Sequence, residues 1–183
     1  RAASAELLDR YARSDEARWM PASVLEIARA MRDHDLHRIR AALPDDFFFH
    51  DHRRAGVDRI EGADDYVASM AAVYEQSPDA IPNHLYDIVV EKHGSLSVGG
   101  TVGTLTDGGE FESVFVRLML FQGDRFVGFE LFELDDLDVA RARFEELRPD
   151  PLGIPPDGAA ATQSRRRTRR AARVPRTPRA RKP

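Results

Sequence analysis

Three short turns divide residues 85–133 into four strand-like segments, and this pattern restricts the possible folds more than any other feature of the sequence. The turns fall at His93-Gly94, Asp107-Gly108 and Gly123-Asp124. Glycine beside a polar residue is typical of tight hairpin turns, and the segments between the turns are rich in β-branched and aromatic residues. The sequence therefore predicts a four-stranded antiparallel meander.

Helical patterns come before and after this meander. The expected elements are an amphipathic helix after Pro21, a helix capped by Asp35, a strand over residues 47–52, a helix after Gly62 and a short closing helix over residues 137–147. Helices, one strand, a helix and then a long meander indicate an α+β domain. We expect a curved antiparallel sheet wrapped around its own N-terminal helices.

Charge divides the chain into two unlike parts. Residues 158–183 carry nine Arg, one Lys and no acidic residue, whereas the preceding 157 residues carry 17 basic and 31 acidic side chains. Such a tail cannot bury enough apolar surface to offset its ordering entropy, so it is expected to be disordered. We expect a helical lead-in over residues 1–20, the folded domain over 21–148, a proline-rich end over 149–157 and the basic tail over 158–183.

Turn positions also predict which residues share a face of the sheet, because side chains alternate along a strand. A two-residue turn at Gly123-Asp124 pairs Arg117 with Glu130 on a bulky, aromatic face. We expect this face to hold a pocket under the helices, with the Arg117–Glu130 pair as its polar group. Its expected lining residues are Tyr86, Val98, Gly100, Val102, Ser113, Phe115, Met119, Gly128 and Phe132, with His50 and His52 at the rim.

The opposite face of the meander is half small and polar and half aliphatic, with Leu118 and Phe129 among its large residues. One layer of helices covers one face only. An uncovered aliphatic surface of this size is typical of an interface, so the sequence predicts a homodimer through the outer face of the sheet.

Two runs of sequence resemble a known superfamily. They are DHDLHRIRAALPDDFFFHDHRRAG, from Asp33 to Gly56, and IEGADDYVASM, from Ile60, followed by the glycine-turned meander. Together they resemble the nuclear transport factor 2-like superfamily, in particular its SnoaL-like and ketosteroid-isomerase-like branch. The resemblance covers residues 24–133. It implies a cone-shaped α+β barrel of the cystatin-like kind, a pocket at its open end and often a dimer.

The same resemblance suggests catalytic residues. The catalytic aspartate of ketosteroid isomerases corresponds to Asp51, but the position of their oxyanion-hole tyrosine holds Ile27 and that of their second pocket acid holds Arg117. Steroid isomerase chemistry is therefore not expected. If the domain is an enzyme, the resemblance suggests Asp51 as the general base. We then expect Arg117 to stabilise an anion and Glu130 to orient Arg117, on an enolisable polyketide- or steroid-like substrate.

A metal site is not expected from the sequence. His50 and His52 point to the same side of a strand, as two ligands would, but no third ligand lies at motif spacing. Without cysteine, thiolate metal sites and disulfides are excluded. The sequence thus predicts neither a metal nor another cofactor.

Three functions stay open. The first is a dimerising domain, part of a larger bacterial protein, that binds a small apolar molecule. The second is an acid–base enzyme of the isomerase or cyclase kind, and the third is a protein that associates with nucleic acid through its basic tail. No apolar run is long enough for a membrane helix and no signal region begins the sequence, so we expect no membrane contact and a cytoplasmic location.

Overall fold

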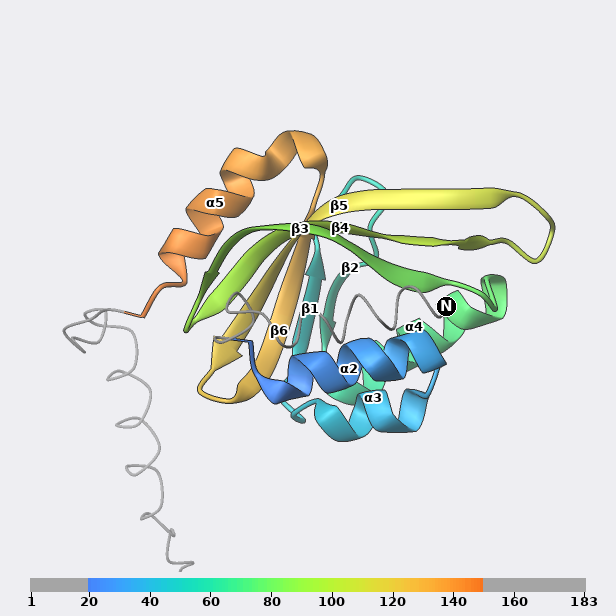
Figure 1. Cartoon of the computed structure of the whole chain (residues 1–183), viewed down its shortest axis with the longest axis horizontal. Coiled ribbons are helices and arrows are strands. Elements are labelled where there is room, and N and C mark those ends of the chain that lie inside the picture. Colours follow the sequence, from blue (N-terminus) through green and yellow to red (C-terminus); the bar gives the residue numbers. More distant parts are fainter. Residues whose placement is uncertain (1–19, 150–183) are drawn as a thin grey trace, which may run out of the picture. The chain divides into compact units, whose positions relative to one another are not determined.

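The computed structural model describes residues 20–149, which form one sheet with helices on both of its sides (Figure 1). The helices are α2 (Ala22–Asp33), α3 (Leu36–Ala42), α4 (Ala63–Gln76), the 3-10 turn η2 (Leu134–Asp136) and α5 (Leu137–Glu146). The strands are β1 (Phe48–Asp51), β2 (Asp58–Glu61), β3 (Ile81–Glu91), β4 (Gly94–Thr104), β5 (Glu110–Gln122) and β6 (Arg125–Phe132). The domain is α+β, as predicted.

The sheet has the strand order β2-β1-β6-β5-β4-β3 and is not closed into a barrel. Strands β3 to β6 form the predicted antiparallel meander. The early strand β1 extends it, parallel to β6, and the short strand β2 pairs with β1 at the edge. Residues far apart in the sequence therefore meet along the β1–β6 border.

Local sequence explains the ends of the first two helices. Helix α2 begins after Pro21 and ends at His34, whose left-handed backbone lets its N–H reach the carbonyls of Ala30 and Met31. Asp35 then caps α3, since its side chain accepts a hydrogen bond of 3.0 Å from the backbone N–H of Arg38. Both boundaries agree with the sequence prediction.

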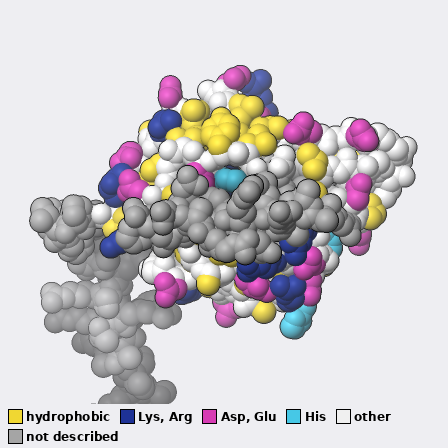
Figure 2. All heavy atoms as spheres, in the orientation of Figure 1, with side chains coloured by type: hydrophobic (Ala, Val, Ile, Leu, Met, Phe, Trp, Pro, Cys, Tyr) yellow, Lys and Arg dark blue, Asp and Glu magenta, His cyan; other side chains and the backbone are white. Residues whose placement is uncertain are grey.

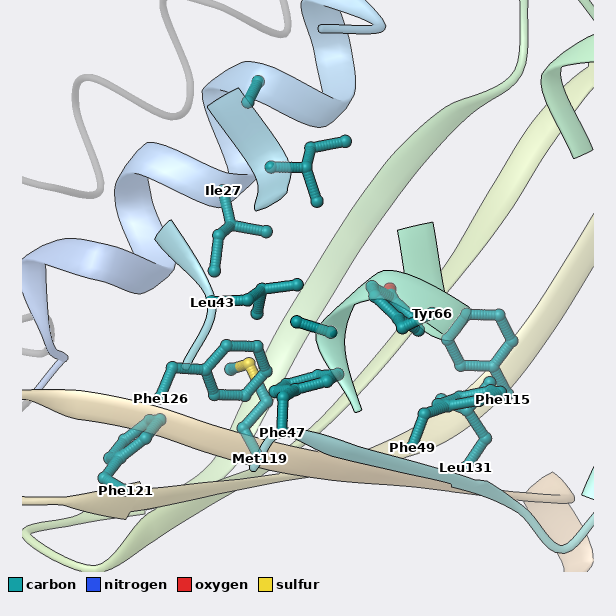
Figure 3. Close-up of a cluster of buried hydrophobic side chains, with 13 residues drawn as sticks. Ile27, Leu43, Phe47, Phe49, Tyr66, Phe115, Met119, Phe121, Phe126 and Leu131 are labelled. Atoms are coloured by element: carbon teal, nitrogen blue, oxygen red, sulfur yellow. The ribbon is translucent and has the colours of Figure 1, made fainter. Parts of the chain in front are cut away.

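Two hydrophobic cores lie on opposite faces of the sheet. The larger core, between the sheet and helices α2, α3 and α4, includes Ile27, Phe47, Tyr66, Phe115 and Met119 (Figure 3). We call this side the inner face. The second core lies under α5, on the other side of the sheet, which we call the outer face (Figure 1). Its buried members are Leu96, Val98, Val116, Leu118, Leu120, Phe132, Ala140 and Phe144.

The predicted register of the meander is wrong by one residue over most of its length. Phe121 pairs with Phe126 as expected, but a bulge follows, so that Leu118 rather than Arg117 stands opposite Glu130. The β4–β5 loop is also longer than the expected two-residue turn, because the strands close at the pair Thr104–Glu110. A one-residue slip moves every side chain of a strand to the other face.

The turn at His93-Gly94 also differs from the predicted one. Lys92 and His93 alone form the β3–β4 turn, with Glu91 opposite Gly94, and two irregularities interrupt the pairing further along β3. Gly94 belongs to the strand, where a Cβ atom would lie 2.3 Å from the carbonyl oxygen of Met119. Close backbone approach, not a left-handed turn, requires this glycine.

The expected bare outer face is covered. Helix α5 packs on it, and Leu118 is 0% exposed there, while Phe129 turns to the inner face and joins the larger core. The argument for a dimer from an uncovered aliphatic surface therefore fails, and the homodimer itself stays a prediction. The lead-in over 1–20, apart from Met20, and the tail over 158–183 lie outside the described residues. No helix of residues 20–149 combines the length and apolarity that crossing a bilayer requires.

Candidate functional site

A row of residues crosses the inner face at the level of Arg117. Strand pairing places Asp51 of β1, Leu131 of β6, Arg117 of β5, Ser97 of β4 and Asp87 of β3 side by side. Leu131 belongs to the inner core, and directly paired residues project to the same face. Five strands therefore bring two acids, a base and a hydroxyl into one row, beside the aromatic core.

Asp51 is engaged by a neighbour from its own loop. The guanidinium of Arg53 donates to both carboxylate oxygens at 2.8 Å, and Asp51 is only 5% exposed. Arg53 also donates to the hydroxyl of Ser113 at 3.1 Å and lies 4.9 Å from the centre of the Phe115 ring. This fork-like pair raises the pKa of Arg53 and occupies both carboxylate oxygens of Asp51.

Arg117 contacts a histidine, His84, that no sequence motif singled out. Its guanidinium lies 3.2 Å from Nδ1 of His84, and Nε2 of His84 lies 3.6 Å from a carboxylate oxygen of Asp87. A guanidinium only donates hydrogen bonds, so Nδ1 of His84 is the acceptor and its proton sits on Nε2, facing Asp87. The result is a chain of polar groups, Arg117–His84–Asp87, on the inner face.

Tyr66 brings a hydroxyl into the same interior. Tyr66 is 3% exposed, and its ring packs against Phe47 and Phe49 (Figure 3) and also against Phe129. Burial raises the pKa of Tyr66, and the charge of Arg117 acts in the opposite direction, so the two groups are within electrostatic reach of each other. Among the residues that the structure describes, the hydroxyl of Tyr66 has no hydrogen-bond partner.

Glu130 is not part of this row, which corrects the predicted Arg117–Glu130 pair. It points to the outer face, where it is 0% exposed. Its carboxylate lies 2.8 Å from Nε2 of His52 and 3.2 Å from the guanidinium of Arg143 on α5. The bulge in β5–β6 is the cause, since it rotates Glu130 away from Arg117.

The other predicted lining residues are divided between the two faces. Ser113, Phe115 and Met119 lie on the inner face with Asp51 and Arg117. Those that belong to the outer face by strand pairing and packing are Tyr86, Val98, Gly100, Val102, Gly128, Phe132, His50 and His52. The predicted single pocket wall is therefore wrong as a set. A ligand contact at any of these residues stays a prediction.

An open groove of about 550 Å³ lies at the far end of the meander. Its walls include Asp79, Gly103, Thr104, Phe111 and Glu112. Asp79 is used structurally there, since it accepts hydrogen bonds from the backbone N–H and the hydroxyl of Thr104 at 2.7 and 2.9 Å. These bonds lower the pKa of Asp79. None of the groove's lining residues belongs to the row at Arg117.

Solved structures with this architecture are nuclear transport factor 2-like proteins. One, of unknown function, from Burkholderia pseudomallei, has a TM-score of 0.52 and 22% identity over 65% of this chain and 92% of that chain. A putative polyketide cyclase from Sinorhizobium meliloti has a TM-score of 0.51 and 12% identity over 62% and 95%. Bal32a, from a soil-derived mobile gene cassette, has a TM-score of 0.56 and 12% identity over 73% and 100%.

These likenesses show the fold. The chain has the nuclear transport factor 2-like fold, shared with the putative polyketide cyclase, a protein with the ketosteroid isomerase-like fold from Catenulispora acidiphila and a cystatin-fold protein from Novosphingobium aromaticivorans. The resemblance read from the sequence is confirmed at this level. No protein-family model matches the sequence, and no curated protein matches it significantly.

Proposed function

We propose that this domain binds a small, largely apolar organic molecule between the inner face of the sheet and helices α2 and α4. The observation that carries the proposal is the hydroxyl of Tyr66. It is surrounded by aromatic rings and near Arg117, yet has no partner in the described part of the chain. A hydroxyl placed among aromatic rings is a polar group to which a ligand oxygen can hydrogen-bond.

A second hydroxyl supports the same place. Ser95 lies opposite Met119 on the inner face, is 0% exposed, and its oxygen has no hydrogen-bond partner among residues 20–149. Aromatic walls with a few convergent polar groups are typical of small-molecule sites. We expect a ligand with fused or aromatic rings and a carbonyl or phenolic oxygen directed toward Tyr66 and Arg117.

Proteins with the same fold supply the chemical class. TerC was co-crystallised with polyporic acid, and a protein with the ketosteroid isomerase-like fold from Catenulispora acidiphila was solved in complex with trimethylamine. Another neighbour is described as a putative polyketide cyclase. At 12 to 15% identity these are properties of those proteins, and they guide the choice of test compounds here.

The acid–base enzyme is the weaker alternative. Its proposed base, Asp51, has both oxygens bonded to Arg53, and its proposed orienting acid, Glu130, lies on the other face. A general base must reach the proton it removes, and both oxygens of Asp51 already accept hydrogen bonds from Arg53. Ligand binding without proton transfer explains the polar groups of the inner face with fewer assumptions.

Binding of Nile red by the full chain tests the proposal. This dye is neutral, so the basic tail does not attract it, and its carbonyl oxygen accepts hydrogen bonds. We expect Tyr66→Phe and Arg117→Met each to weaken binding about tenfold, the loss of roughly one hydrogen bond near 1.4 kcal/mol. Arg125→Met is the matched control, since Arg125 pairs with Asp46 on the surface. Equal affinity in all four proteins would overturn the proposal.

A further inference from the structure

Two histidines and a glutamate meet on the outer face of the sheet, away from the proposed ligand site. His50 lies in β1, His52 is the first residue after β1, and Glu130 lies in β6. Each offers one ligand atom, and the three atoms lie within 4.8 Å of one another. Sequence spacing alone did not show this group, because the third member lies 78 residues beyond His52.

Strand pairing holds the three residues together. β1 runs parallel to β6, with His50 directly opposite Glu130. The backbone N–H of His52 donates to the carbonyl of Leu131 at 2.9 Å, and its ring stacks on Phe132 at 4.4 Å. The rings of His50 and His52 are 3.7 Å apart. Backbone hydrogen bonds and ring packing therefore position the ligand atoms before any ion arrives.

The surroundings of Glu130 are those of a ligating carboxylate. The residue is fully buried. Its Oε1 accepts from Arg143 at 3.2 Å, and its Oε2 lies 2.8 Å from Nε2 of His52 and also accepts from Nε of Arg143 at 3.4 Å. Outer hydrogen bonds of this kind orient metal ligands. The side chains of His50 and His52 are 25% and 32% exposed, so an ion and a water molecule have access from solvent.

Nearby charges act in both directions. Arg143 and Arg59 disfavour a cation. Arg143 also pairs with Glu146 at 2.8 Å, and this ion pair can persist when a metal ion binds Glu130. Asp58 lies 3.6 Å from Nε2 of His50 and adds negative charge at the open side.

We propose that His50, His52 and Glu130 bind one divalent transition-metal ion, of which Zn²⁺ is the representative. Tetrahedral zinc bonds of about 2.0–2.2 Å place ligand atoms roughly 3.4 Å apart. The observed spread, up to 4.8 Å, contracts to that distance by small rotations of the half-exposed imidazoles. Three protein ligands leave a fourth position for water, so the site has the composition of an open metal centre.

Calorimetric titration of the metal-stripped full chain with Zn²⁺ tests the proposal, and Co²⁺ absorption in the visible range reports the coordination. We expect one ion per chain, a raised melting temperature and an intense four-coordinate Co²⁺ spectrum. His50→Gln and His52→Gln should each weaken binding by about 100-fold or more, since even outer-sphere changes cost 10–100-fold. His37→Gln, an exposed histidine on α3, is the matched control.

Two results with these variants would overturn the proposal. Binding that His50→Gln and His52→Gln leave unchanged, or no binding at micromolar Zn²⁺, overturns it. Glu130→Gln is less useful, because removing a buried charge partner can unfold the domain. Nile red affinity, measured on the same variants, should stay at the wild-type value, because the two sites lie on opposite faces. A failed metal test therefore leaves the proposed ligand site in place.

Discussion

At the scale of single residues, one glycine controls the position of Asp51. A Cβ atom on Gly56 would lie 2.5 Å from the carboxyl carbon of Asp51 and 2.7 Å from one of its oxygens. The backbone N–H of Gly56 donates to the carbonyl of Arg53 at 2.9 Å, so the loop cannot easily move outward. Gly56 is thus the residue that lets the Asp51–Arg53 pair close over Phe115.

Gly56→Ala is expected to lower the free energy of unfolding by about 1–3 kcal/mol, because the new methyl group displaces the Asp51 carboxylate from Arg53. Urea denaturation measures this loss. In an Arg53→Met background the same change should cost clearly less, since the pair is already broken. Equal losses in both backgrounds would contradict the explanation.

A second prediction at this scale concerns Asp79, whose pKa is lowered first by the backbone N–H of Thr104 and then by its hydroxyl. A carboxylate with a lowered folded-state pKa stabilises the fold above its unfolded pKa, near 3.9, and loses this effect as the pH falls through the folded value. Asp79→Asn should therefore destabilise the domain at pH 7 and make no difference at pH 2. Urea denaturation at both pH values checks this, and a constant difference would count against it.

At the scale of elements, α5 decides what the outer face can do. The sequence predicted this helix but not its position, and a second copy of the chain was expected where α5 packs. Figure 2 shows that hydrophobic side chains still gather at the surface where α5 meets the sheet. Leu118 is not among the accessible ones, since it is fully buried beneath the helix.

Leu118→Arg is therefore expected to damage the fold, not an interface. An unpaired guanidinium under α5 should lower the free energy of unfolding by about 3–5 kcal/mol. Val139→Arg, on α5 itself but 57% exposed, is the control and should change stability by less than about 0.5 kcal/mol. A well-folded Leu118→Arg protein of wild-type stability would show that α5 does not cover this face.

At the scale of the whole molecule, one sheet supports two separate groups of polar side chains. The inner face carries Arg117, His84 and Tyr66 among aromatic rings, and the outer face carries the two histidines with Glu130. The sheet lies between them, so each can change without direct contact with the other. The uneven charge of the chain is a third feature at this scale, and it concerns the tail.

The basic tail should give the full chain a weak, salt-dependent affinity for duplex DNA, because its ten positive charges displace counterions from phosphates. We expect a mobility shift at 50 mM salt that is lost near 200 mM. A chain ending at Asp157 has a net charge of −14 and should give no shift. A shift that survives this truncation would assign DNA binding to the folded domain.

The order of elements could be predicted because each one depends on nearby residues. Pro21, Asp35 and the glycine turns mark boundaries through local backbone preferences, and the closing helix shows its own apolar spacing. The short strand β2 was missed, since residues 58–61 are mostly polar and exposed and pair only with β1. The superfamily resemblance, carried by the same local patterns, led to the correct fold.

The candidate sites depended on contacts between distant residues. A bulge between Leu120 and Phe121 separated Arg117 from Glu130, and no short-range signal marks it. Parallel pairing of β1 with β6 brought His50 opposite Glu130, and irregular pairing along β3 placed His84 beside Arg117. By itself the sequence determined most of the elements and their order. The tertiary structure decided which side chains meet, because one added residue in a strand reverses a face and only packing selects where it is added.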